Sequence, residues 1–218
     1  MHSPHIHVLT FNLAGENTYI LSGPGENACI IDPGCSTPEE EQTLREYLER
    51  NHLTPTLCLC THKHFDHIAG CEYVHKTWGV IPKLSDLEDQ LVPSLSDQLR
   101  FFGLPSPSAD DISFELLHVD DLKPITWEGI TISLLHIPGH SPGHLVFHLP
   151  DYGILFTGDT LFSGGIGRTD LWHGSTSDLI SSIRTRLLTL PGETVIYPGH
   201  GPSGTIAEEK VSNPFLRH

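Results

Sequence analysis

A run of metal-binding side chains follows a short apolar stretch at residues 57–60. Four candidate ligands occur within six residues as His-x-His-x-Asp-His, formed by His62, His64, Asp66 and His67. Imidazole nitrogen and carboxylate oxygen are donors that zinc and similar ions accept. On an extended backbone, His62 and His64 face the same way and can chelate one ion. After the chain turns, Asp66 and His67 face a neighbouring point, so the sequence predicts a metal centre at a strand end.

Three further ligand-type residues lie in turns that contain glycine. They are His140 in Pro-Gly-His-Ser, Asp159 in Thr-Gly-Asp-Thr and His200 in Pro-Gly-His-Gly. With the first run they give five histidines and two aspartates, which is enough to hold two divalent ions. A carboxylate can bridge two ions whereas imidazole normally does not, so one aspartate is the natural bridge. The residues therefore predict a binuclear metallohydrolase.

Strands and helices must position these side chains, and their pattern runs through both halves of the sequence. Apolar β-type runs predict strands at residues 17–21, 28–31, 55–61, 130–137, 144–149, 153–157 and 194–197. Helical patterns cover residues 37–50, 68–78, 175–188 and 206–211. Thr37, Pro38 and Glu40 match a capping box at the first helix. This order of strands and helices fits an α/β fold in which two sheets are sandwiched between helices, with the ligands on the loops at one edge.

The length of 218 residues predicts a single domain spanning residues 1–218. Residues 83–123 differ from the rest, because they contain several prolines and polar residues with only weak periodicity. We expect an irregular excursion over the surface there, with at most one short helix. Such segments are often lids or binding loops. An ordered connection without function is the alternative for this segment.

Composition limits the classes of partner. The formal net charge of −15 disfavours a nucleic acid, whose phosphates would be repelled. Five cysteines without regular spacing favour a reducing compartment, and Cys58 and Cys60 can be buried thiols or a metal-binding pair. The first residues do not resemble a signal peptide, and no apolar run is long enough to span a bilayer. We expect a cytoplasmic protein without a membrane partner.

The ordered ligands and the Asp32-Pro33-Gly34 turn resemble the metallo-β-lactamase superfamily over essentially the whole chain. The resemblance implies an αββα sandwich with the metal site at the edge of the sheets. It also implies which residues bind each ion. The first metal is bound by His62, His64 and His140, the second by Asp66, His67 and His200, and Asp159 bridges them.

Within that superfamily, several short sequence segments resemble the short, single-domain glyoxalase II branch. They lie at residues 17–20, 139–144, 158–162, 165–170 and 213–215. This implies hydrolysis of a small thioester such as S-lactoylglutathione. Two ions, zinc or else iron or manganese, would share a water and lower its pKa, and Asp66 would orient the resulting hydroxide. Full-length glyoxalase II carries a C-terminal helical domain that holds glutathione, whereas this sequence ends soon after His200.

Three other residues have two interpretations each. Arg168, in a glycine-rich loop, could bind a substrate carboxylate or pair with Asp170 to fix the loop. His144 is either a partner of a metal ligand or a core histidine. Asp32 is interpreted as a residue that fixes its turn and supports a ligand, with direct metal binding as the alternative.

The main alternative function is a persulfide dioxygenase on the same fold. Such an enzyme uses one iron held by two histidines and one aspartate, here His62, His140 and Asp159. The ligand pattern does not separate the two functions, but the metal content per chain does. A β-lactamase is disfavoured because zinc β-lactamases lack a bridging aspartate at the position of Asp159. A non-enzymatic metal-binding protein is the remaining alternative.

Overall fold

The computed structural model describes residues 3–23, 25–106 and 112–217 and mixes helices with strands. Contacts between residues divide the chain into two compact units. The N-terminal unit comprises residues 1–84 and 93–116, and the C-terminal unit comprises residues 85–92 and 117–218. The single domain spanning the chain stays a prediction. In the described part of the chain, no helix combines the length and the apolar character that crossing a bilayer requires.

One sheet organises the N-terminal unit, and its strands lie in their order along the chain. Among the described residues they are β1 (His5–Phe11), β2 (Glu16–Ser22), β3 (Asn27–Ile31), β4 (Thr54–Leu59), β5 (Lys83–Ser85) and β6 (Glu115–Leu117). The pairs β1–β2 and β2–β3 are antiparallel, whereas β3 and β4 are parallel. The three strands predicted in this region are therefore confirmed. No bounds were predicted for the edge strand β1.

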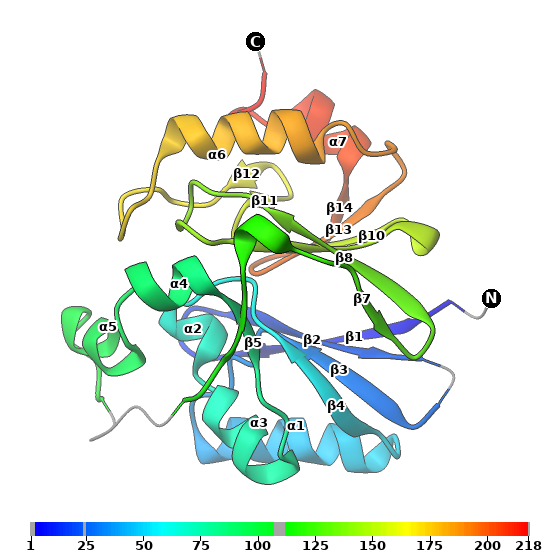
Figure 1. Cartoon of the computed structure of the whole chain (residues 1–218), viewed down its shortest axis with the longest axis vertical. Coiled ribbons are helices and arrows are strands. Elements are labelled where there is room, and N and C mark those ends of the chain that lie inside the picture. The colour runs from blue at the N-terminus through cyan, green and yellow to red at the C-terminus, as the bar shows by residue number, and fades with distance from the viewer. Residues whose placement is uncertain (1–2, 24, 107–111, 218) are drawn as a thin grey trace. The chain divides into compact units, whose positions relative to one another are not determined.

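Helices α1 (Pro38–Arg50) and α3 (Cys71–Trp78) cover one face of this sheet (Figure 1). Leu44 and Leu48 of α1 and Val74 of α3 pack against Ile30 and Cys58 of the strands, and all five are almost fully buried. Burying one such aliphatic side chain contributes about 1.5–3 kcal/mol relative to exposure. This core fixes the end of β4, and therefore the loop that follows it.

The start of α1 differs from the predicted capping box. The hydroxyl of Thr37 accepts a hydrogen bond from the Glu40 amide, as expected. The Glu40 carboxylate instead accepts from the amides of Ser36 and Asn12, so it ties two other segments to the helix. A reciprocal capping box is present at α7 (Ile206–Ser212), between Thr205 and Glu208.

The expectation of an irregular excursion over residues 83–123 was wrong. The segment contains β5, β6, the helices α4 (Asp86–Leu91) and α5 (Leu95–Phe101) and the 3₁₀ turn η1 (Val119–Asp121). Serine caps explain both helices, because Ser85 and Ser94 accept from the amides of Glu88 and Asp97. Residues 107–111 of the candidate lid lie outside the described residues.

A second sheet organises the C-terminal unit. Among the described residues its order is β14 (Gly204–Thr205), β13 (Val195–Pro198), β10 (Ile154–Gly158), β9 (Leu145–Leu149), β8 (Ile130–His136) and β7 (Ile125–Trp127). Only β10 and β13 pair in parallel among these described strands. The four strands predicted in this region are confirmed. A short hairpin of β11 (Leu161–Phe162) and β12 (Gly165–Ile166) follows β10.

Helix α6 (Thr176–Ser182) lies along this sheet and continues into a π-helical turn, η3 (Ile183–Leu187) (Figure 1). Leu179, Ile183 and Leu187 are fully buried and belong to one core with Val146 and Ile196. The predicted helix over residues 175–188 is confirmed, apart from its wider last turn. Helix α7 confirms the last predicted helix.

Candidate metal centre

The first four predicted ligands follow β4 at the carboxyl end of a parallel strand pair. Residues 61–64 continue without regular structure, and the single-turn helix α2 (Phe65–Ile68) then begins after His64. This change from extended to helical backbone turns Asp66 and His67 away from the direction of the preceding residues. His62, His64, Asp66 and His67 are all buried. Together they form what we call the N-terminal ligand set.

His62 and His64 lie close enough to share one ion. Nε2 of His62 is 3.1 Å from Nδ1 of His64. Two imidazole nitrogens bound to one tetrahedral zinc at about 2.0–2.1 Å would be roughly 3.3 Å apart. The spacing of these nitrogens therefore suits a shared metal, as the His-x-His pattern predicts.

Asp32 supports this set from the end of β3. Its Oδ2 is 2.9 Å from Nδ1 of His67, and its carboxylate also accepts from the amide and hydroxyl of Thr61, each at 2.6 Å. An imidazole that donates Nδ1–H to a carboxylate keeps its lone pair on Nε2, the form that binds a metal. Ligand atoms of Asp32, His62 and His67 all lie within 4.8 Å of one another. The contacts with Thr61 and His67 agree with the supporting role predicted for Asp32.

Two residues outside the predicted set also hold this segment. Gln98 of α5 is fully buried, accepts from the Phe65 amide at 2.9 Å and donates to the Lys63 carbonyl at 2.7 Å. The Asn12 side chain donates to the backbone carbonyls of Gly34 and Asp66 at 2.9 and 2.8 Å. Amide side chains far away in sequence carry no local signal, so sequence reasoning could not find them.

Glu16 at the start of β2 is a further buried carboxylate that the sequence analysis missed. It accepts from the Thr18 hydroxyl at 2.9 Å. Burial raises the pKa of Glu16 well above its ordinary value, and nearby His67 acts in the opposite direction. A methyl group built on Gly34 would lie 2.0 Å from Glu16 Oε2. Glycine is therefore required where the Asp-Pro-Gly turn passes this carboxylate.

Asp159 and His200 lie together because their strands are parallel neighbours. Asp159 follows β10 and His200 follows β13, and the Gly199 amide donates to the Gly158 carbonyl at 2.9 Å. Nε2 of His200 is 3.5 Å from Oδ2 of Asp159. His140 also approaches this oxygen, with Nε2 at 3.8 Å. These three residues form the C-terminal ligand set, with the carboxylate facing two imidazoles.

The backbone around His140 fixes its ring. Gly139 has φ 132°, and a methyl group on it would lie 2.2 Å from the Leu179 amide nitrogen. Nδ1 of His140 is 2.7 Å from the Arg168 carbonyl oxygen, which can only accept a hydrogen bond. His140 therefore carries its proton on Nδ1 and presents the lone pair of Nε2 toward Asp159. This is the tautomer that a metal ligand needs.

His144 holds the other side of Asp159. It is fully buried, and its Nε2 accepts from the Asp159 amide at 3.1 Å. Of the two interpretations left open for His144, the structure supports a partner of a predicted ligand. Gly167 also packs here, because a methyl group on it would lie 1.9 Å from the Asp159 carbonyl oxygen and 2.8 Å from His140 Nδ1.

Arg168 and Asp170 form the predicted loop-fixing pair. The guanidinium donates twice to the carboxylate, from Nε at 2.7 Å and from an Nη at 2.8 Å. Arg168 lowers the pKa of Asp170 to about 2. The pairing interpretation is confirmed, while a role of Arg168 in binding a substrate carboxylate stays a prediction.

The donor chemistry of both ligand sets fits divalent ions such as zinc, iron or manganese. Each set combines neutral imidazoles with carboxylate oxygens, and second hydrogen bonds to Asp32 and to the Arg168 carbonyl hold His67 and His140 as metal-binding tautomers. The five cysteine thiols are free and buried, so they lie in the core. An α/β fold with these two sets defines a metal-binding enzyme of metallohydrolase type.

The chain belongs to the metallo-beta-lactamase superfamily, whose sequence model matches residues 12–200. It is 36% identical to hydroxyacylglutathione hydrolase GloC of Haemophilus influenzae, over 97% of this chain and 98% of that protein. It is 32% identical to the human mitochondrial persulfide dioxygenase ETHE1, over 91% of this chain and 70% of that protein. The crystal structure of the B3 metallo-beta-lactamase BLEG-1 has a TM-score of 0.87 and 34% identity, covering 98% of this chain and all of that one.

These similarities confirm two predictions made from the ligand pattern. The superfamily is the one that the sequence resembled, and the α/β, metallo-β-lactamase-like fold class is correct. The roles of individual ligands, the metal and its number, and the substrate stay predictions.

Proposed function

We propose that the two ligand sets together bind two divalent metal ions and that the protein hydrolyses a small thioester. S-lactoylglutathione is the proposed representative substrate, and zinc is the proposed metal. The observation that carries this proposal is the complete set of five histidines and two aspartates at strand ends and in turns, with hydrogen bonds that support His67, His140 and Asp159. The 36% identity with GloC over nearly the whole length of both chains supports the thioester class.

We propose the following roles for the residues of the two ligand sets. His62, His64 and His140 would hold one ion, Asp66, His67 and His200 would hold the other, and Asp159 would be shared between them. Such a pair of ions supplies hydroxide near neutral pH and polarises the carbonyl that is attacked. The Asp66 carboxylate would orient the attacking oxygen by accepting a hydrogen bond from it. A thiolate leaving group is a weak base, so this chemistry needs no strong general acid.

The test combines metal analysis with a thioester panel that includes S-lactoylglutathione. We expect about two ions per chain and metal-dependent hydrolysis, which Asp66→Ala or Asp159→Ala lowers by at least about a hundredfold. Asp120→Ala is a matched control, because Asp120 is exposed in the 3₁₀ turn η1. Unchanged turnover in the ligand variants would contradict the proposed site.

The same preparation distinguishes the alternative oxidoreductase. The 32% identity with human ETHE1 is the reason to measure this second activity. A dioxygenase would replace our proposal if the protein held one iron per chain, took up oxygen when a persulfide is added and hydrolysed no thioester. A β-lactam added to the panel tests the third activity, because the structural neighbour BLEG-1 is described as a β-lactamase.

We further propose that the protein acts in the cytoplasm on a small molecule, without nucleic acid or membrane partners. The net charge of −15 supports this, because it would repel phosphate backbones and anionic membrane surfaces. The five buried free thiols support a reducing compartment.

A further inference from the structure

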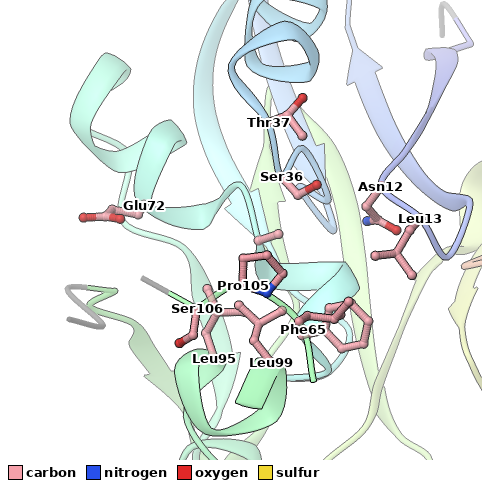
Figure 2. A pocket seen from close by; sticks show the side chains of 12 residues that line it. Asn12, Leu13, Ser36, Thr37, Phe65, Glu72, Leu95, Leu99, Pro105 and Ser106 are labelled. Atoms are coloured by element: carbon pink, nitrogen blue, oxygen red, sulfur yellow. The ribbon is translucent and has the colours of Figure 1, made fainter. Parts of the chain in front are cut away.

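A hollow of about 560 Å³ lies in the N-terminal unit beside α2 and α5. Figure 2 shows its lining, in which Phe65, Leu95, Leu99 and Pro105 gather on one side and Leu13 stands opposite. Small-molecule pockets typically measure about 300–1,000 Å³ and have mainly apolar walls. In size and in lining, the hollow therefore resembles a binding pocket for a small apolar group.

The polar residues on its wall are engaged with neighbouring protein groups. The Ser36 amide and hydroxyl both donate to Glu40, and the Thr37 hydroxyl accepts from the Glu40 amide. The Ser106 hydroxyl donates to the Ser96 carbonyl at 3.2 Å. The hollow is therefore suited to hydrocarbon groups rather than to charged or strongly polar groups.

The negative charge of Glu72, the acidic residue on the wall, is also neutralised by a partner. It forms an ion pair with Lys76 one turn later in α3, so this rim carries little net charge. A ligand bearing carboxylates and an ammonium group, such as glutathione, would bury charge here without partners, which is costly. An uncharged hydrocarbon tail would bury only apolar surface, which is favourable.

The walls of the hollow are tied to the segment that carries the N-terminal ligand set. Phe65 lies between the predicted ligands His64 and Asp66 and is itself part of the wall. Gln98, one position before Leu99 on α5, is hydrogen-bonded to the backbone on both sides of His64. Asn12, another wall residue, donates to the Asp66 carbonyl at 2.8 Å.

We propose that this hollow is the acyl pocket of the enzyme, binding the uncharged hydrocarbon tail of an acyl thioester. The inference rests on the proposed thioester hydrolysis and deepens it by naming the acyl class. A lactoyl group, as in the representative substrate S-lactoylglutathione, would leave this pocket unfilled, so the pocket adds a longer and more apolar acyl class to the same hydrolysis. The substrates favoured by this pocket therefore carry straight, apolar acyl chains of several carbons.

The direct test is a series of thioesters that share one thiol and differ in acyl length. With acetyl, butanoyl, hexanoyl and octanoyl thioesters of N-acetylcysteamine, we expect kcat/KM to rise by about two- to fourfold per methylene until the tail fills the pocket. The fourfold limit corresponds to complete burial of each methylene. A flat or falling series would overturn the proposal.

Two variants test whether the dependence of kcat/KM on acyl length arises in the pocket. Leu99→Trp fills the hollow, and Leu13→Glu places a charge at its mouth, where Leu13 is 76% exposed and the change should not disturb folding. Both should lower the octanoyl-to-acetyl ratio of kcat/KM by at least about fourfold, since two or more methylenes lose burial at about two- to fourfold each. Ile81→Trp is the matched control, because Ile81 is also exposed and lies outside the hollow. Its ratio should equal that of the wild type.

A binding measurement separates failure of this proposal from failure of the proposed function. The S-octyl and S-ethyl thioethers of N-acetylcysteamine cannot be hydrolysed, so calorimetry with the wild-type protein reports binding alone. Tighter binding of the octyl compound that is lost in Leu13→Glu supports the pocket, even if no thioester is turned over. Equal binding of both thioethers, or an octyl preference that survives in Leu13→Glu and Leu99→Trp, would overturn it.

Discussion

Nδ1 of His140 lies 2.7 Å from the backbone carbonyl oxygen of Arg168, although 28 positions separate the two residues. A carbonyl oxygen only accepts hydrogen bonds, so this contact sets the tautomer of a predicted ligand without using a side chain. Gly167 precedes that carbonyl and packs against both His140 and Asp159. The segment at residues 167–168, which follows β12, therefore acts on the ligands through its backbone.

Gly167→Ala should disturb two predicted ligands at once. The added methyl group would meet the Asp159 carbonyl at 1.9 Å and His140 Nδ1 at 2.8 Å, so the backbone must shift. Overpacking of this kind typically costs about 1–3 kcal/mol of unfolding free energy. We expect a lower melting temperature and weaker zinc binding, measured by thermal unfolding and by chelator competition.

Gly165→Ala is the control for this change, because a methyl group there meets nothing closer than 3.8 Å and the φ of Gly165 is not in the left-handed region. If Gly167→Ala matched Gly165→Ala in both melting temperature and zinc affinity, the packing argument would be wrong.

Asp32→Asn tests the support of His67. Asparagine keeps the size of the side chain and one acceptor for the Thr61 amide, but it loses the charge that faces His67 Nδ1. Removing such partners typically weakens metal binding by about 10- to 100-fold. Competition with a chromogenic chelator measures the change, and Asp120→Asn at an exposed position should bind metal as the wild type does. Equal affinities in the two variants would show that Asp32 does not support the ligand.

The Arg168–Asp170 pair makes a prediction about pH. Arg168 lowers the pKa of Asp170 to about 2, so the pair persists above the ordinary aspartate pKa of about 3.9 and is lost as the pH falls toward 2. In Arg168→Gln the pKa of Asp170 should rise toward the ordinary value. Carboxyl chemical shifts followed by NMR titration in both proteins give the two values. An unchanged Asp170 pKa would contradict the pairing in solution.

The cysteines should be unreactive in the folded protein. Burial raises the pKa of Cys29 and of Cys35, so little thiolate forms at these two residues near neutral pH. Hydrogen bonds with the Cys60 and Cys71 thiols lower the pKa of Cys58 to about 6, so for this residue it is burial alone that shields the thiol from reagents. A chromogenic aromatic disulfide should release almost no colour from the native protein and about five equivalents after denaturation in guanidinium. Rapid reaction of one thiol in the native state would show that a core segment opens readily.

Local signals in the sequence predicted most of the fold. Alternating or continuous apolar runs marked the strands, and Thr37 and Pro38 marked a helix start that the structure confirms. The bounds of the edge strand β1 were not predicted because most of its residues are only partly buried, which weakens the apolar signal. Residues 83–123 were misjudged because two short serine-capped helices have too few turns to show periodicity.

The candidate site was predictable where its residues are ligands and unpredictable where they hold ligands in place. The spacing of His62, His64, Asp66 and His67 is visible in the sequence because metal chemistry fixes it. Gln98 acts on the Lys63–Phe65 backbone from 33 and 35 positions away, and only folding brings these atoms together. Contacts of this kind depend on how the chain packs, so no local pattern reports them.

Asp32 adopts a φ of 51°, a left-handed conformation that few side chains other than asparagine and aspartate tolerate. Glycine would relieve the strain of this bend but would leave Thr61 and His67 without their shared acceptor. Asparagine would tolerate the bend but would carry no charge. The positive φ and the need for a negative charge together leave aspartate as the amino acid that suits position 32. Random mutagenesis at this codon should therefore return almost only aspartate among active clones.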